Sequence, residues 1–477
     1  MNVPSVCTLA LIATLPFGSQ ATAQSMILLE DVAIVDVEAG TVTPGQSVLI
    51  EDGMILQVGA DLTIPTGPLE TFDGNAGYLI PGLWDSHVHI FSSPAEPATA
   101  LPLYLINGVT GIRDMGALWS FEDQQALQTQ IEAREVLGPR IVLSGAWVDG
   151  SPGSWPGMFL ADTPGQAAEV VGQIASEGWA AVKAYSMLSE PTYRSLAEAA
   201  AEAGLPLVGH IPEQVTLGTA IEVGQAGMEH FGRIPMACST REAEMVEALS
   251  EAMARNADLD EVFGLMADRN GIILSSWDEA LCESVLADMV DAALHVSPTL
   301  VVADFYIGNW PAPDAPRMRM IPAEVREAWG RPDFRLEAVT DEVLELAEAT
   351  IALDRQTFAM AHAAGVPILA ASDASFANPY LFHGFSLLDE LDIYIDAGLT
   401  PQEALYTATV APPRFFGLPD QDGTIAQGQR ADMVLLEANP LADLATLRRP
   451  IALVVNGRLL DRVTLDAMEA DLIARGE

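Results

Sequence analysis

Short apolar runs recur along the central part of the chain, with helical patterns between them. Such runs are typical of strands that are buried on both faces. Two of the helical patterns cover residues 190–203 and 336–364. We therefore predict an α/β fold, a (β/α)8 TIM barrel of parallel strands and helices whose active site lies at the carboxyl ends of the strands. The eight predicted strands lie within residues 81–90, 109–114, 140–144, 179–185, 205–210, 227–230, 295–302 and 366–373.

The two ends of the chain have a different pattern. Residues 26–80 and 424–460 alternate as short strands around turns such as Glu51-Asp-Gly53. Both ends are therefore predicted to build one small, discontinuous β-sandwich domain beside the barrel. The predicted boundaries are residues 24–80 and 416–477 for the sandwich and 81–415 for the barrel.

The first residues suggest an export signal. An apolar stretch, Val6–Phe17, is followed by the small-residue pattern Ala21-Thr-Ala-Gln24. This pattern predicts a signal peptide over residues 1–23 and a periplasmic or secreted bacterial protein. The segment before the apolar stretch has no lysine or arginine, so a disordered or strand-forming N-terminus is the alternative. No other apolar run reaches the length of about 20 residues that a membrane span needs.

The chain is strongly acidic, since 66 acidic residues against 22 basic ones give a formal net charge of −44. This charge opposes contacts with phosphates, so nucleic acid is excluded as a partner. The expected partner is a small molecule, and a homo-oligomer is left open. Without the predicted signal peptide, Cys238 and Cys282 are the cysteines that remain, and their pairing is left open as well.

One basic residue stands apart, because 21 of the 22 are arginine and the single lysine is Lys183. It lies in the apolar run Trp179–Tyr185, where an ammonium without a partner is unfavourable. Lys183 could be held by an ion pair inside a sheet. Alternatively, the neutral amine could add CO2 and become a carbamate, an anionic ligand able to bridge two metal ions, which arginine cannot do.

Metal-competent side chains occur at the predicted strand ends. His87 and His89 are two residues apart, so on a strand both imidazoles point to the same face. His210, His230 and Asp373 each end a short apolar run. The carboxyl ends of barrel strands meet at one face of the fold, so we expect these side chains to lie together.

These motifs resemble those of the metal-dependent amidohydrolase superfamily. The resemblance rests on His87-Val-His89, a strand lysine, two strand-ending histidines and Ser372-Asp373-Ala374, and it extends to the C-terminal segment 423–436. Val182-Lys-Ala-Tyr185, Gly209-His-Ile-Pro212 and Glu229-His230 are most similar to the imidazolonepropionase-like and prolidase-like branch, which includes dipeptidases and an ochratoxin-hydrolysing amidase.

The resemblance implies two divalent metal ions, with zinc as the first expectation. His87, His89 and Asp373 would hold one ion, and His210 and His230 the other. Carboxylated Lys183 would bridge the two ions. Asp373 would also be the catalytic residue that accepts the proton of the attacking water.

The implied activity is hydrolysis of a C–N bond in a small amide, such as a dipeptide, an N-acyl amino acid or an ochratoxin-like amide. A hydrolase of cyclic amides, lactones or other esters on the same metals is the first alternative. A non-catalytic exported binding protein is the second. Retention of every ligand position opposes this second alternative.

Residues that contact the substrate have weaker sequence signals than the metal ligands. Tyr185 follows Lys183 by two residues on the same face, Trp147 follows the third predicted strand, and His383 follows the eighth. All three are candidates for substrate binding, and ordinary packing is the alternative for each. Other side chains on these loops are further candidates for the pocket: the aromatic Trp155, Tyr306 and Trp310, and the basic Arg317 and Arg319.

Overall fold

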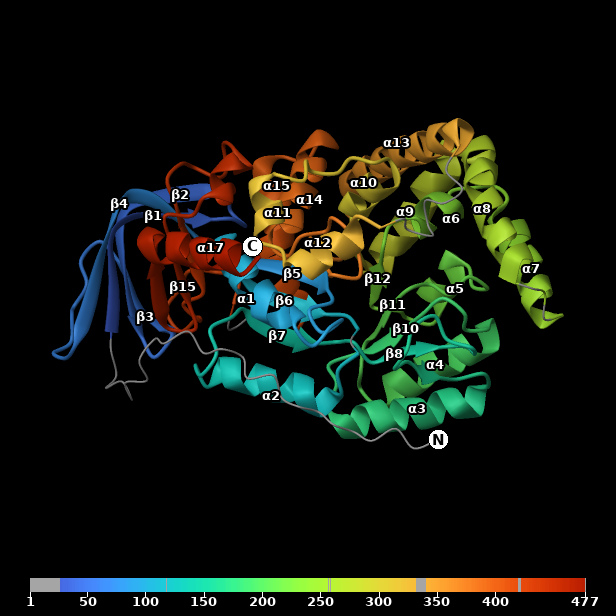
Figure 1. Ribbon diagram of the computed structural model, residues 1–477, viewed down its shortest axis with the longest axis horizontal. Coiled ribbons are helices and arrows are strands. Elements are labelled where there is room, and N and C mark those ends of the chain that lie inside the picture. Colours follow the sequence, from blue (N-terminus) through green and yellow to red (C-terminus); the bar gives the residue numbers. More distant parts are fainter. Residues whose placement is uncertain are drawn as a thin grey trace.

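The computed structural model describes residues 26–476, apart from residues 117, 256, 258, 332–339 and 419–421. The predicted signal peptide therefore lies outside the described residues. Parallel strands alternate with helices through the centre of the chain, and one large sheet lies at one end of the molecule (Figure 1). This arrangement confirms the predicted α/β class.

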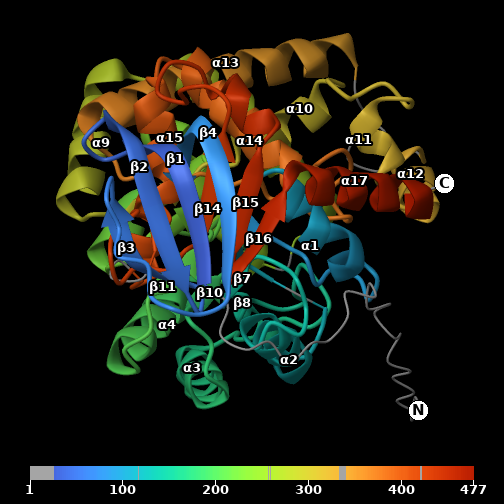
Figure 2. The same ribbon diagram turned by 90° about the vertical axis from the view of Figure 1, so that its left-hand side faces the viewer.

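Both chain ends contribute to the large sheet, which Figure 2 shows face on. The C-terminal strand β14 pairs antiparallel with the N-terminal strand β4, with Met433 opposite Pro81. All seven strands belong to one sheet, so the two packed layers of the predicted sandwich are not confirmed. In sheet order the strands are β16 (Arg458–Asp461), β15 (Ala452–Val455), β14 (Met433–Leu436), β4 (Leu69–Pro81), β1 (Met26–Asp36), β2 (Thr41–Glu51) and β3 (Met54–Gly59).

The local sequence explains the hairpin between β2 and β3. Asp52 and Gly53 both have positive φ angles, 51° and 74°. A two-residue turn of this kind matches the twist of the flanking strands and favours Asp-Gly. On one face of the sheet, alternate side chains from both chain ends, among them Ile27, Leu79 and Met433, form a buried apolar cluster.

The central strands are short, parallel and fully or nearly buried. β5 pairs with β6, and β6 pairs with β7. β10 pairs with both β8 and β11, and β12 pairs with β13. Their bounds are β5 (Leu83–Val88), β6 (Val109–Asp114), β7 (Arg140–Leu143), β8 (Trp147–Asp149), β10 (Val182–Ala184), β11 (Leu207–Gly209), β12 (Gly227–Glu229) and β13 (His295–Ser297), and a short strand β9 (Phe159–Leu160) pairs with β8.

Backbone hydrogen bonds link these small sheets to one another. Ala180 N donates to Leu143 O at 3.0 Å, and Ala226 N donates to Leu207 O at 2.8 Å. The segment predicted as the eighth strand, 366–373, is linked on both sides: Val296 bridges Ile368, and Val88 bridges Ala374. The segments are therefore connected in sequence order, and the last one returns to β5.

Helix ends follow from local capping. α4 (Glu190–Glu202) lies where a helix was predicted, and α13 begins at Asp341 because the Thr340 hydroxyl accepts a hydrogen bond from Val343 N. Residues 336–339 of that prediction lie outside the described residues. Apart from α4, the helices are α1 (Glu96–Ile106), α2 (Phe121–Glu132), α3 (Pro164–Glu177), α5 (Leu217–Glu222), α6 (Arg233–Ala237), α7 (Glu242–Ala254), α8 (Leu259–Ser276), α9 (Glu279–Asp291), α10 (Ala303–Tyr306), α11 (Pro316–Arg319), α12 (Ala323–Trp329), α13 (Asp341–Ala364), α14 (Phe385–Asp396), α15 (Pro401–Thr409), α16 (Ala411–Phe415) and α17 (Arg462–Gly476).

Two further points concern the chain as a whole. Cys238 and Cys282, whose pairing the sequence left open, form a disulfide between the end of α6 and α9. Within the part of the chain that the structure describes, no helix combines the length and the apolar character needed to cross a membrane.

Candidate metal centre

Three of the predicted ligands converge at the end of β5. Asp373 Oδ1 lies 3.4 Å from His87 Nε2 and 3.3 Å from His89 Nε2. The two Nε2 atoms are 3.2 Å apart. Donor atoms of all three side chains lie within 4.8 Å of one another, as a shared metal ion requires. The backbone holds this arrangement, because Asp373 N donates to His87 O at 2.8 Å.

The tautomers of the His87 and His89 imidazoles indicate that a cation fits between them. His87 Nδ1 faces a carboxylate oxygen of Glu229 at 2.8 Å, and His89 Nδ1 faces the carbonyl oxygen of Gly116 at 2.8 Å. Both partners can only accept, so both Nδ1 atoms carry the proton. The two Nε2 lone pairs therefore face each other across 3.2 Å, beside a carboxylate oxygen. Lone pairs and an anion in this arrangement repel one another unless a cation binds between them, so the donor set fits a divalent metal.

His210 and His230 lie beside this group. The rings of His87 and His230 are 5.0 Å apart between centroids, and those of His230 and His210 are 4.9 Å apart. His210 Nδ1 is 2.9 Å from Ser186 Oγ, and His230 Nδ1 is 2.8 Å from Thr299 Oγ1. With Nδ1 used in this way, Nε2 is the nitrogen that each ring offers to a metal. These two histidines lie outside the tight three-residue group but next to it.

Lys183 is buried on β10 beside the histidines. Its Nζ donates to Met115 O at 2.7 Å and lies 5.7 Å from the ring centroids of both Trp147 and Tyr185. Burial lowers the pKa of Lys183 to about 8, although the negative charges of Glu229 and Asp373 oppose this shift. Close approach of the next strand is possible because Gly209 has no side chain. A Cβ there would lie 2.8 Å from Lys183 Cγ and 2.3 Å from Ala184 O.

The charge states of the ligands suit metal binding. Burial lowers the pKa of His87, His210 and His230, so these imidazoles are neutral near pH 7 and keep a lone pair for a metal. Burial opposes ionisation of Asp373, but contact with the His89 imidazole and the positive charge of nearby Lys183 outweigh it. The pKa of Asp373 therefore lies below its ordinary value, and the carboxylate is anionic.

Strained backbone conformations also occur at these strand ends. His230, Thr299 and Asp373 have φ angles of 64°, 51° and 56°, in the left-handed region that residues other than glycine rarely adopt. Such conformations cost about 1–3 kcal/mol each and persist where the surrounding structure imposes them. Here the backbone turns at two proposed ligands, His230 and Asp373. It also turns at Thr299, whose hydroxyl contacts His230.

Sequence reasoning missed a buried ion pair behind the ligands. Arg113 Nη2 donates to Glu229 Oε1 at 2.7 Å, while Glu229 Oε2 accepts from His87. Arg113 also donates to Ser86 O and Ser297 Oγ, so it links its own strand, β6, to β5, β12 and β13. The available signal was an arginine and a glutamate within otherwise apolar strands.

Two buried aspartates were missed as well. Asp85 accepts hydrogen bonds from Ser372 N and Oγ, and Asp114 accepts from Ile90 N and Gly116 N. Burial raises the pKa of each to about 7. Both carboxyl groups brace the loops that carry the ligands.

Two of the three residues predicted to bind substrate lie against the ligands. The ring of Tyr185 stacks on His210 with centroids 4.1 Å apart, and the ring of Trp147 stacks on His89 at 6.0 Å. Trp155 Nε1 donates to the Tyr185 hydroxyl at 2.9 Å. Tyr185 and Trp147 are thus placed to line the space beside the metal ligands, and Trp155 is joined to them.

His383 is placed differently from the prediction. It is fully buried, and its two ring nitrogens contact the Tyr104 hydroxyl at 2.8 Å and Glu96 Oε1 at 2.9 Å. With both nitrogens engaged inside the protein, it is not positioned to contact a substrate. Arg317, one of the further candidates for the pocket, pairs instead with Asp389 at 2.7 Å.

Comparison with known proteins identifies the family. The model of the amidohydrolase family matches residues 78–460. Ochratoxinase from Aspergillus niger is 23% identical over 462 residues, covering 89% of this chain and 85% of that protein. Among solved structures, a bottromycin amidohydrolase has a TM-score of 0.70 at 22% identity and covers 94% and 90% of the two chains. A putative prolidase from Bifidobacterium longum has a TM-score of 0.64 at 22% identity and covers 94% and 99%.

The family match spans most of the chain and includes all six predicted metal ligands. The solved structures share the fold along nearly the whole length of the chain. The chain therefore belongs to the amidohydrolase family and is a hydrolase that acts on carbon–nitrogen bonds.

Proposed function

We propose that this protein hydrolyses the amide bond of a dipeptide, an N-acyl amino acid or a similar small amide at a centre of two divalent metal ions. The observation that carries the proposal is the pair of Nε2 lone pairs of His87 and His89, which face each other beside the anionic Asp373. The names of the relatives, an ochratoxinase and a prolidase among them, support an amide substrate.

We also propose that the parallel segments close into the (β/α)8 barrel. The support is the chain of hydrogen bonds that runs in sequence order from β5 to residues 366–374 and returns to β5. In such a barrel the catalytic face is at the carboxyl ends of the strands, where the six proposed ligands lie.

Each protein group has a defined part in the reaction. His87, His89 and Asp373 would hold one ion, and His210 and His230 the other. When bound, two divalent ions lower the pKa of water toward about 7 and polarise the substrate carbonyl. Asp373 is anionic and accepts the proton of the attacking water, then returns it to the leaving nitrogen.

The charge at Lys183 supports its carboxylation. As an ammonium, Lys183 lowers the pKa of His87, His210 and His230 and repels any cation that they bind. Conversion to a carbamate replaces that positive charge with an anionic ligand at the same place. The lowered pKa of about 8 increases the fraction of neutral amine, which is the form that adds CO2.

The experiment that tests this function combines metal analysis with a substrate panel. Purified protein is dialysed, and its metal content is measured by emission spectroscopy; about two divalent ions per chain are expected. Turnover is then measured on dipeptides and N-acyl amino acids beside lactones, cyclic amides and other esters. Turnover confined to the second group would favour the alternative activity, and a protein that binds no metal and cleaves nothing would contradict both.

We further propose that the protein is exported. The support is the signal-like pattern of residues 1–24 together with the Cys238–Cys282 disulfide, a bond that persists in oxidising compartments. Mass spectrometry of the protein isolated from its natural host tests this proposal. Loss of residues 1–23 is the expected result, and an intact N-terminus in the cytosolic fraction would contradict it.

A further inference from the structure

A buried carboxylate that the proposed mechanism does not use lies behind the loops that follow His89 and Asp373. It belongs to Glu96, the first residue of α1, which is fully buried. The first turn of a helix favours a negative charge, because its free backbone N–H groups carry partial positive charge. Burial is still unfavourable for a carboxylate unless hydrogen bonds satisfy its oxygens. The donors that surround Glu96 therefore determine whether it is stable there.

Both oxygens of Glu96 accept hydrogen bonds, and the donors come from two different loops. Ser92 Oγ, three residues after His89, donates to Oε2. Phe376 N, three residues after Asp373, donates to Oε1 at 2.6 Å. The carboxylate of Glu96 therefore joins the loop that follows one proposed ligand to the loop that follows another.

The same two loops contact each other at two further points. His89 N donates to Ala374 O at 3.0 Å, directly beside the proposed ligands. Farther along, Ser375 Oγ donates to Ser92 Oγ at 3.0 Å. Ser92 in turn donates its own hydroxyl hydrogen to Glu96. These hydrogen bonds run in one direction across the two loops and end on the Glu96 carboxylate.

His383 and Tyr104 complete the surroundings of Glu96. His383 Nε2 lies 2.9 Å from Glu96 Oε1, and His383 Nδ1 lies 2.8 Å from the Tyr104 hydroxyl. A carboxylate oxygen accepts, so Nε2 carries the proton and Nδ1 of the neutral ring accepts from Tyr104. Burial raises the pKa of Tyr104, so its hydroxyl keeps the proton that this bond needs. All three groups are fully buried, and together they hold the carboxylate in one place.

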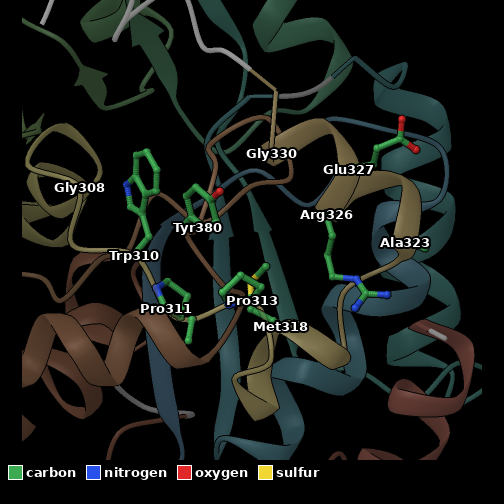
Figure 3. A pocket seen from close by; sticks show the side chains of 11 residues that line it. Gly308, Trp310, Pro311, Pro313, Met318, Ala323, Arg326, Glu327, Gly330 and Tyr380 are labelled. Carbon is green, nitrogen blue, oxygen red and sulfur yellow. The ribbon is translucent and has the colours of Figure 1, made fainter.

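The loop after the catalytic aspartate is also held on its outer side. Trp329 Nε1 donates to Phe376 O at 2.9 Å, and the Tyr380 hydroxyl donates to Trp329 O at 3.2 Å. The ring of Tyr380 stacks on that of Trp310 beside a cavity that both side chains line (Figure 3). These contacts join the loop to the segment that carries the two tryptophans, whereas Glu96 joins it to the other ligand loop.

We propose that Glu96 is a positioning residue that sets the spacing between His89 and Asp373. His89 Nε2 and Asp373 Oδ1 are 3.3 Å apart, and this inference rests on the proposed function, in which both side chains hold the same metal ion. A metal ion accepts ligand distances within about 0.2 Å of its preferred values, so the spacing of the two loops affects its affinity. Glu96 acts on that spacing through the backbone of both loops.

Glu96→Gln is the first variant to test. Glutamine has nearly the same size, but one of its two terminal atoms is a donor, so it cannot accept from both Ser92 and Phe376 in the same geometry. Zn2+ affinity is measured on metal-free protein by competition with a chelator. The affinity for one of the two ions is expected to fall about tenfold or more. With the ions at saturation, kcat is expected to fall about tenfold or more. KM is expected to change by less than about twofold.

Ser92→Ala is a milder second variant, which removes the hydroxyl between the two loops and leaves Glu96 in place. Its Zn2+ affinity is expected to fall about two- to tenfold, the equivalent of one hydrogen bond. If Glu96→Gln does not fold, unchanged affinity in Ser92→Ala would overturn the inference.

Tyr380→Phe is the matched control, because it removes a hydrogen bond from the outer side of the same loop and keeps the ring. Its Zn2+ affinity is expected to change by less than about twofold. Equal affinities in Glu96→Gln, Tyr380→Phe and the unmodified protein, with all three folded by circular dichroism, would overturn the inference.

Hydrogen exchange of the metal-free protein separates this inference from the proposed function. Amide exchange in residues 89–95 and 373–380 is expected to be about tenfold faster in Glu96→Gln than in the unmodified protein. If no metal binds and no amide is cleaved, but exchange rises in both loops, the proposed function fails and the role of Glu96 in holding the loops stands. If amides are cleaved while exchange and Zn2+ affinity are unchanged in Glu96→Gln, that role fails and the proposed function stands.

Discussion

Glu229 and His87, which are 142 positions apart in the chain, meet in the buried interior with Glu229 Oε2 2.8 Å from His87 Nδ1. The other carboxylate oxygen accepts from Arg113. This pair fixes the tautomer of His87 and turns its Nε2 toward Asp373. A carboxylate behind a histidine ligand also increases the basicity of the imidazole.

The pair leads to a prediction for Glu229→Gln. The amide can still accept from His87 but carries no charge, and it leaves Arg113 without its anionic partner. Metal affinity is expected to fall about 10- to 100-fold. Competition with a fluorescent chelator measures it. Glu283→Gln, at an exposed position of α9, is the control. Unchanged affinity in Glu229→Gln would show that the carboxylate acts only as the partner of Arg113.

Lys183 is the next position to test. Lys183→Arg keeps a positive charge at all relevant pH values, so bridging and nearly all turnover are expected to be lost. Lys183→Ala leaves space in which propionate can act as a carboxylate, so added propionate is expected to restore part of the activity. The unmodified protein with propionate is the control. Normal turnover and metal content in Lys183→Arg would identify the lysine as a structural ion-pair partner.

A pH dependence follows from the pKa of about 8 at Lys183. Only the neutral amine adds CO2, and its fraction rises as the pH rises through this pKa. For metal-free protein at fixed dissolved CO2, recovery of activity on adding metal is expected to accelerate from about pH 6 to about pH 9 and then level off. The rate is followed by stopped assays. A rate that does not change over this interval would argue against carbamate formation.

Asn378 is expected to act by positioning Asp373. Its side-chain amide donates hydrogen bonds to the main-chain oxygen and to a carboxylate oxygen of Asp373, whose backbone has a strained, positive φ angle. Asn378→Ala should lower kcat by about 10- to 100-fold, because small misplacements of a catalytic group have effects of this size. KM should change by less than about twofold. A parallel change in both constants, or a large loss of thermal stability, would indicate a structural role instead.

The disulfide gives a stability prediction. Cys238 and Cys282 close a loop with a sequence separation of 44 residues. Replacing both by alanine is expected to lower the free energy of unfolding by about 2–4 kcal/mol. Denaturant titration measures this change, and adding dithiothreitol should destabilise the unmodified protein but not the variant. Two free thiols in the native, unreduced protein would contradict the pairing.

The predictions from sequence that agree best with the structure depend on local geometry. A spacing of two residues puts His87 and His89 on one face of a strand in any fold that contains that strand. The ends of parallel strands meet at one face, so His210, His230 and Asp373 could be expected near them before any coordinates were known. The short apolar runs likewise predicted the central strands, since a buried strand needs apolar side chains on both faces.

What only the tertiary structure decided are contacts between residues distant in sequence. The partnership of Glu229 with His87 and Arg113, the burial of His383 between Tyr104 and Glu96, and the stacking of Trp310 on Tyr380 join separate segments. The pairing of β14 with β4 in a single sheet is of the same kind. Hydrophobic periodicity specifies which face of an element is buried. It carries no information about which distant side chain lies against that face, because packing of the whole chain determines that neighbour.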